Sequence, residues 1–190
     1  MYEAGLAPLS IDLKRATDLY ARSCDMGNGF GCSSAGYMYG TGRGVLLDYP
    51  KAIGYYGHSC DLGVGQGCYN LGVMYEQGYG VPKDPTRALL NFEYGCLIGS
   101  AAGCSSAGVA YLMGAGVKAD VDEASRQARI AKGIKYLEQG CSGGNQWGCE
   151  RLKELAAAAN GGASPSPGPS GGDKGGGHGS GTDKPSGSTM

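Results

Sequence analysis

The sequence is poor in several residues on which enzymes and nucleic-acid-binding proteins depend. Its 190 residues include only two histidines, one tryptophan and two phenylalanines. Sixteen lysines and arginines against 17 aspartates and glutamates leave a net charge of −1, without the basic surplus that nucleic-acid binding normally requires. No apolar run approaches the ~20 residues of a membrane-spanning helix. We therefore expect neither nucleic acid as the main partner nor a membrane span.

Glycine is abundant, and part of this excess lies at the end of the chain. Residues 160–190 contain 11 glycines, six serines and four prolines, and no leucine, isoleucine, valine, phenylalanine, tyrosine or tryptophan. A segment without such side chains to bury cannot offset the entropy that is lost when its backbone is ordered. We predict a disordered tail over 160–190 and a folded domain over 1–159.

The eight cysteines reveal an internal repeat. They form four pairs with a constant spacing of eight residues, namely Cys24 and Cys32, Cys60 and Cys68, Cys96 and Cys104, and Cys141 and Cys149. An aspartate also recurs every 36 residues, at positions 12, 48, 84 and 120, and several glycines and tyrosines share this period. Self-similarity at a fixed period is typical of repeat architectures. We predict repeat units over 12–47, 48–83, 84–119 and 120–159.

Each unit contains the signals of two helices. In the third unit Asp84 is a suitable N-cap, and Pro85 fits the first helical position, where its missing N–H costs no hydrogen bond. Asp120 and Glu123 form a capping-box pattern in the fourth unit. The other helix begins at the second cysteine of a pair and ends at a glycine, as over 68–78. Because a short hairpin cannot bury its apolar face alone, we expect the units to stack into an all-α solenoid.

The fourth unit is longer than the others. Seventeen residues separate Ala124 from Cys141, against eight between the equivalent positions of the first three units, so nine residues are inserted. No turn signal precedes Gly133, which predicts a helix longer by about two and a half turns. The stretch from Cys149 to about Ala158 lacks the repeated glycine and tyrosine. It predicts a capping helix, which terminal repeats usually need.

The first residues match the middle of a unit and not its beginning. Residues 1–5 align with residues 74–78, with methionine, tyrosine and glycine at the same relative positions. We therefore expect the first helix to be truncated. Its opening residues, and any signal peptide, would then lie upstream of this sequence.

The repeated motif resembles a known family. The pattern Y-N-L-G-V-M-Y-x-x-G-x-G-V-x-x-D-x-x-x-A-x-x-x-Y-x-x-x-C is similar to the Sel-1-like repeat, a relative of the tetratricopeptide repeat. The paired cysteines, as in C-D-L-G-x-x-x-G-C at 60–68, resemble those of the Helicobacter-type cysteine-rich proteins and, more distantly, a mitochondrial intermembrane-space assembly factor. The resemblance covers about residues 1–158. It implies helical hairpins, cross-linked by disulfides, in a right-handed superhelix.

The cysteine pairs allow three states. Antiparallel helices joined by a seven-residue turn bring the two Cβ atoms of a pair within disulfide range. We predict four local disulfides, each stabilising its unit by at most about 2.6 kcal/mol. The alternatives are a zinc site, which favours cysteines two to four residues apart, and reduced, buried cysteines. Disulfides imply an oxidising compartment, either the periplasm or the cell exterior, with the mitochondrial intermembrane space as a further option.

The resemblance also implies a binding surface. In the tetratricopeptide fold the first helix of each hairpin lines a concave groove. This places one set of residues in the predicted groove: Ser33, Tyr37, Tyr69, Asn70, Val73, Glu76, Ser105 and Val109. Tyrosine provides contact area at a low entropy cost, and asparagine can hydrogen-bond a backbone amide. The alternative interpretation is that these residues simply face solvent.

Signals of catalysis are scarce. His58 is the only histidine in the repeats, and the Ser-x-x-Lys tetrad of serine β-lactamases is absent. We predict no catalytic residue, no metal and no cofactor, and a monomeric scaffold that binds a protein or peptide. The resemblance implies an alternative, a penicillin-binding or β-lactamase activity, because some cysteine-rich family members carry that label. A third interpretation is an assembly factor for a redox complex, which free thiols or bound haem would favour.

Overall fold

The chain forms stacked helices, as the repeat predicts. The computed structural model describes residues 12–159, which contain helices and no strand. The helices are α1 (Leu13–Asp25), α2 (Gly29–Thr41), α3 (Tyr49–Asp61), α4 (Gly65–Gln77), α5 (Pro85–Leu97), α6 (Ala101–Met113), α7 (Glu123–Ser142) and α8 (Gln146–Ala159). Within residues 12–159, no helix combines the length and the apolar character needed to cross a bilayer. The predictions of a truncated first helix and a disordered tail fall outside the described residues.

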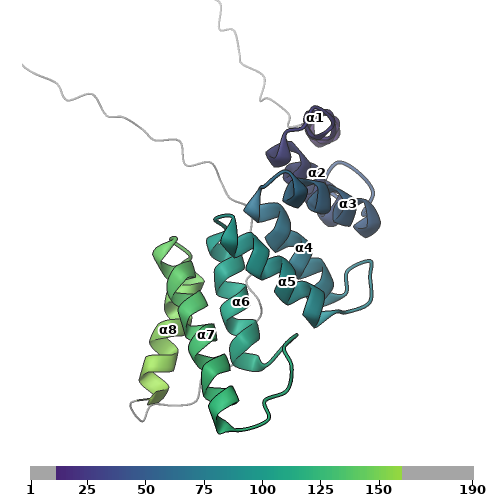
Figure 1. The fold of residues 1–190 in the computed structure, drawn as a ribbon. Coiled ribbons are helices and arrows are strands. Elements are labelled where there is room, and N and C mark those ends of the chain that lie inside the picture. The colour runs from purple at the N-terminus through teal and green to yellow at the C-terminus, as the bar shows by residue number, and fades with distance from the viewer. Residues whose placement is uncertain (1–11, 160–190) are drawn as a thin grey trace, which may run out of the picture.

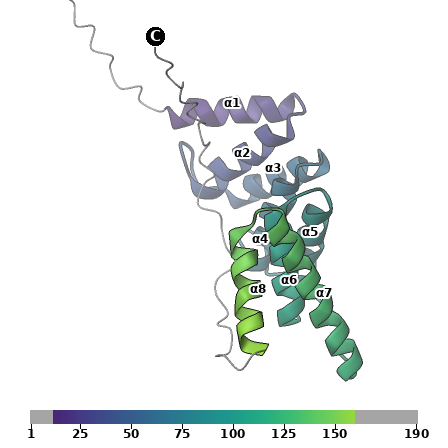
Figure 2. The same ribbon diagram turned by 90° about the vertical axis from the view of Figure 1, so that its left-hand side faces the viewer.

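The helices pack in sequence order. Each helix contacts the next along the chain, and α2, α4, α6 and α8 also contact one another across successive hairpins. Figure 1 shows the resulting stack, with α1 at one end and α7 and α8 at the other. In Figure 2 the helix axes change direction along the stack, so that α8 lies at a steep angle to α1. The prediction of an all-α solenoid of helical hairpins is confirmed.

Repeated caps fix where most helices begin and end. The side chains of Asp12, Asp48 and Asp84 each accept a hydrogen bond of 2.9 Å from a backbone N–H in the first turn of α1, α3 and α5. The glycines that follow α2, α4 and α6 adopt the left-handed conformation, which only glycine enters at little cost: Gly42, Gly78 and Gly114. The repeated aspartate and glycine therefore act as the sequence predicts.

The fourth unit uses a different cap. Asp122, and not Asp120, accepts a hydrogen bond of 2.7 Å from the backbone N–H of Ser125 at the start of α7. The Asp120 carboxylate instead binds the guanidinium of Arg129, with 2.8 Å between Oδ2 and Nη2. The predicted capping box of Asp120 and Glu123 is therefore wrong. Its aspartate is held by an arginine two turns further along α7, a pairing that a local pattern does not reveal.

The helices extend past the cysteines, which corrects the predicted turn. In every hairpin the first helix ends one residue after the first cysteine, and the second begins three residues before the second cysteine. The turns are 26–28, 62–64, 98–100 and 143–145, so each has three residues and not seven. Helix α7 has 20 residues against 13 in α5, which makes it longer by about two turns.

A repeated glycine sets the spacing between neighbouring helices. A Cβ atom on Gly36 would lie 2.7 Å from the ring of Tyr56, and one on Gly72 would lie 2.6 Å from the ring of Phe92. Glycine thus allows the aromatic ring of the following helix to pack against the helix backbone. Phe92 is buried and also contacts the ring of Tyr69, with 5.9 Å between the ring centroids. This cluster forms the middle of the core.

Candidate binding surfaces

A disulfide bridges every three-residue turn. The bonded pairs are Cys24–Cys32, Cys60–Cys68, Cys96–Cys104 and Cys141–Cys149, with Cα atoms 4.4 to 4.6 Å apart. Each bond ties the end of one helix to the first turn of the next. The cross-linked hairpins that we expected are therefore present, and the N-terminal ends of α4, α6 and α8 meet along one edge of the stack.

A groove of about 450 Å³ runs along this edge, and we call it the turn groove. It crosses three successive turns and is lined by Phe30, Gly63–Gln66, Ile98–Ala102 and Gly143–Asn145. Phe30, Gln66 and Ala102 occupy the same position in their repeats, 36 residues apart. The side chain of Phe30 is 72% exposed. The groove therefore uses the same repeat position in successive hairpins, with a different side chain at each, and has an exposed aromatic ring on its wall.

The predicted groove residues lie elsewhere. None of the following lines the turn groove or the larger hollow described below: Ser33, Tyr37, Tyr69, Asn70, Val73, Glu76, Ser105 and Val109. Tyr69 is 2% exposed and packs in the core, and Ser105 is fully buried where α6 meets α7 and α8. Neither can contact a ligand on an open face, so these two were assigned wrongly. The other six are partly buried on α2, α4 and α6 and stay a prediction.

The N-cap residues of α2 and α6 are the sequence feature from which the turn groove could have been located. Asn28 and Ser100 accept hydrogen bonds from the backbone N–H groups of Gly31 and Gly103, at 3.1 and 3.0 Å. Asparagine and serine are preferred N-caps, so their places four residues before a cysteine mark the true helix starts. Counting from the cysteines instead omitted the first helical turn, and with it the residues that line the groove.

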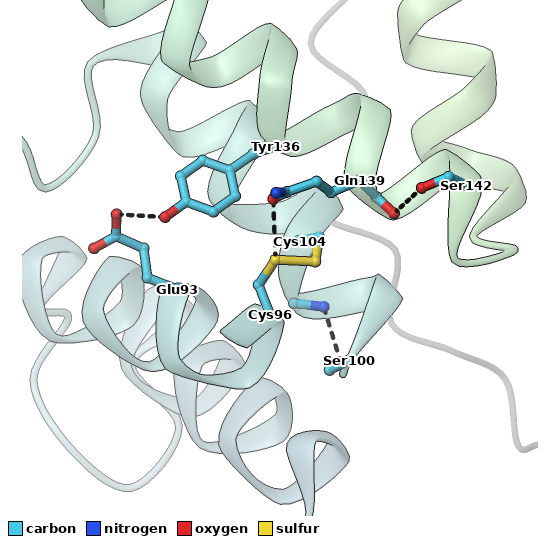
Figure 3. Close-up of a disulfide and its surroundings, with 8 residues drawn as sticks. Glu93, Cys96, Ser100, Cys104, Tyr136, Gln139 and Ser142 are labelled. Atoms are coloured by element: carbon cyan, nitrogen blue, oxygen red, sulfur yellow. Dashed lines mark hydrogen bonds between the residues drawn. A yellow bond between two sulfur atoms is a disulfide. The ribbon is translucent and has the colours of Figure 1, made fainter. Parts of the chain in front are cut away.

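A larger hollow lies between α5, α6 and α7, beside the turn groove, with which it shares Gly99, Ala101 and Gly143. It has a volume of about 780 Å³, and its lining includes the Cys96–Cys104 disulfide, Glu93, Lys132, Lys135 and Gln139. Figure 3 shows Gln139 of α7 beside the disulfide, and Tyr136 of α7 with its hydroxyl directed at the carboxylate of Glu93 on α5. We call it the α5–α7 hollow.

The polar groups of the α5–α7 hollow neutralise one another. Glu93 Oε1 accepts hydrogen bonds from the hydroxyls of Tyr111 and Tyr136, at 2.8 and 3.0 Å, and lies 3.1 Å from Lys132 Nζ. Burial opposes ionisation of Glu93, but these contacts outweigh it and lower the pKa of the carboxyl. Burial and the same carboxylate raise the pKa of Tyr136 to about 12.

Lys132 is unsuited to act as a base. Its hydrogen bonds to Tyr111 and Glu93 hold the pKa of the ammonium above its usual value, although burial opposes this. A general base must be largely unprotonated at the working pH. The hollow therefore does not favour the β-lactamase alternative, which stays a prediction.

One group of residues in the described part of the chain has the composition of a metal site. Atoms of Cys24, Cys32 and His58 that can bind a metal all lie within 4.8 Å of one another. The two sulfur atoms are joined in a disulfide, so neither is a thiolate in this state. The arrangement links the first and second hairpins, because His58 belongs to α3.

Comparisons with known proteins agree with the fold. The Sel1 repeat model matches residues 1–28, 31–64, 65–100, 101–124 and 130–145, more than half of the chain. A Sel1 repeat protein from Oxalobacter formigenes is 23% identical, with a TM-score of 0.67 over 81% of this chain and 59% of that one. A protective antigen of uropathogenic Escherichia coli with an SLR fold is 29% identical, with a TM-score of 0.67 over 78% of this chain and 30% of that one.

A third solved structure shares the cysteine-rich character of the chain. Helicobacter pylori cysteine rich protein B is 26% identical, with a TM-score of 0.57, and the match covers 77% of this chain and all of that one. No protein with curated annotation matches the sequence. The chain spans less than two thirds of the length of the first two solved relatives. Together with the repeated hairpins, the family match shows that this chain belongs to the Sel1 repeat family.

Proposed function

We propose that the chain is a scaffold that binds an extended peptide segment of a partner protein in the turn groove. The observation that supports this is the repetition within the groove, which crosses three successive hairpins and uses equivalent residues of each. An extended peptide presents its backbone groups at a regular spacing as well, with about 3.3 Å between residues. Stacked repeats commonly bind partners along surfaces of this kind.

The chemistry of the groove suits a peptide. The exposed ring of Phe30 offers an apolar contact for a partner side chain, and buried aromatic contacts often dominate binding energy. Helix α4 begins at Gly65 without a side-chain cap, so the N–H groups of Gly65 and Gln66 have no side-chain acceptor. The N–H groups in a first turn also have no acceptor within their own helix, and a peptide carbonyl can accept from them.

Four disulfides are consistent with an oxidising compartment, since thiols stay reduced in the cytosol. We place the scaffold in the periplasm or outside the cell.

A peptide selection tests the proposal. A random peptide library on phage is selected against the full-length, disulfide-bonded protein, and the affinity of enriched peptides is measured by calorimetry. The double variant Phe30→Ala/Gln66→Ala should weaken binding at least tenfold, about 1.4 kcal/mol, because it removes contacts in the turn groove.

The matched control changes two exposed residues of the α5–α7 hollow, in the variant Lys135→Ala/Gln139→Ala. This control should bind like the unmodified protein. The proposal fails if the control loses the affinity and the Phe30/Gln66 variant keeps it, or if no selected peptide binds measurably.

A further inference from the structure

In two places, the residue two positions before the first cysteine of a hairpin lies beside the disulfide of the preceding hairpin. His58 of α3 lies beside Cys24 and Cys32, and Gln139 of α7 lies 3.6 Å from Cys96 through its Oε1 atom. Tyr94 holds the same position in the unit between them. Of these three side chains only the histidine is a metal ligand of the kind that sulfur sites use.

The ligand atoms around His58 are close enough together to bind one cation. Zinc binds thiolate sulfur at about 2.3 Å and histidine nitrogen at about 2.0 to 2.1 Å, which places sulfur ligands about 3.8 Å apart. The ligand atoms of Cys24, Cys32 and His58 already lie within 4.8 Å of one another. Opening the disulfide separates the sulfurs in the required direction. The two cysteines are buried and His58 is exposed, so a cation enters from the side of the histidine.

We propose that, when the Cys24–Cys32 disulfide is reduced, Cys24, Cys32 and His58 form a site for a divalent cation of the zinc class. A dithiol reductant donates two electrons and two protons to the disulfide and is itself oxidised to a disulfide. The two cysteine thiols then lose their protons to solvent and bind the cation together with the neutral imidazole. The fourth position stays open to water or to an external ligand.

Reduction and metal binding would replace the covalent cross-link of the disulfide by a cross-link through the cation. In the oxidised protein the end of α1 is tied to α2 by a covalent bond. In the reduced protein the cation ties α1 and α2 together and adds a link to α3 through His58. The first hairpin therefore responds to reduction differently from the second and third, because the hairpins that follow those two carry Tyr94 and Gln139 in place of a histidine.

Cobalt binding to the reduced, full-length protein tests this inference. The protein is reduced with a phosphine, and Co²⁺ is titrated while thiolate-to-cobalt absorption and helical circular dichroism are recorded. We expect one Co²⁺ per chain, displaced by Zn²⁺, with the helical signal retained. The variants His58→Gln and Cys24→Ser/Cys32→Ser should weaken binding at least tenfold.

The matched control is Cys60→Ser/Cys68→Ser, which removes the pair that faces a tyrosine position. It should bind Co²⁺ like the unmodified protein. Equal binding by His58→Gln, or an equal loss in the Cys60/Cys68 control, would overturn the proposal. Loss of the helical signal on reduction would overturn it as well, because the three ligands would then no longer be held together.

Discussion

At the scale of single residues, Gly63 and Gly80 adopt the same backbone conformation in different surroundings. Their φ angles are +77° and +72°, in the left-handed region that costs other residues roughly 1–2 kcal/mol. A Cβ atom on Gly63 would meet nothing within 4 Å, whereas one on Gly80 would lie 2.5 Å from Cβ of Tyr49. Tyr49 also stacks on Tyr79, with ring centroids 5.2 Å apart, so it has little freedom to move.

This difference predicts unequal effects of alanine. Gly63→Ala should lower the free energy of unfolding by about 1 kcal/mol, which is the backbone cost alone. Gly80→Ala should cost at least twice as much, because it adds the clash with Tyr49 to the same backbone cost. Chemical denaturation of the two variants measures both values. Equal costs would show that the crowding at Gly80 is relieved by a small shift.

Glu93 predicts a pH dependence. Its pKa is lower in the folded protein than the ordinary value of 4.5, so its contribution to stability is complete above pH 4.5 and is lost as the pH falls through the folded value. Glu93→Gln should therefore lower stability at pH 7 by about 1 kcal/mol. The gap between the two proteins should close in acid. Thermal melts from pH 7 to pH 3 test this, and a gap that stays constant would contradict it.

Individual residues also show what the sequence could predict. The aspartate caps were predictable because they depend on contacts three residues away, as in Asp48 with the backbone of Lys51. The role of Asp120 was not predictable, because its partner, Arg129, lies nine residues away along the chain. Tyr69 was misplaced for a similar reason. Its burial depends on Phe92 of the following helix, and a position count within one helix does not include that contact.

At the scale of helices and turns, the disulfides should be local supports. Each one closes a loop of only nine residues, counting both cysteines, so its entropic effect on the unfolded chain is smaller than that of a bond closing a long loop. Every hairpin nevertheless has a three-residue turn with a left-handed glycine, Gly27, Gly63, Gly99 or Gly144, and the bond holds the helix ends together across it.

We expect the removal of one internal disulfide to lower the stability of the protein moderately. The variant Cys60→Ser/Cys68→Ser should lower the free energy of unfolding by about 2 kcal/mol, within the limit of about 2.6 kcal/mol set by the size of the loop. Hydrogen exchange should become faster mainly in α3 and α4, because helices in a stack contact chiefly their neighbours. A uniform increase in exchange along the whole chain would contradict the local role.

The starts of the helices were the least predictable feature at this scale. The cysteines mark each hairpin reliably, but they lie inside the helices and not at their ends. The asparagine and serine caps at Asn28 and Ser100 contain the missing information. Because α7 ends one residue past its cysteine like the other helices, the inserted residues extend only its N-terminal part.

At the scale of the whole molecule, the 36-residue period of the sequence predicted that the hairpins stack. It did not predict which edge of the stack forms the turn groove. The 36-residue repeat requires that equivalent residues align along the solenoid, and this held for Phe30, Gln66 and Ala102. Several such sets of equivalent residues run along the solenoid. Which of them lines a groove that is open to solvent depends on the angle between adjacent hairpins. That angle is set by packing such as the contact of Gly108 with Leu137, which involves residues of different helices. The turn groove could therefore be found only from the structure.

The most direct test of the account is hydrogen–deuterium exchange of the full-length, disulfide-bonded protein with and without a library-selected peptide. If the turn groove is the binding surface, the peptide should slow exchange at residues 63–66 and 98–102, which line it. Exchange at residues 132–139, beside the α5–α7 hollow, should not change. Protection at 132–139 with none at 63–66 and 98–102 would contradict the account.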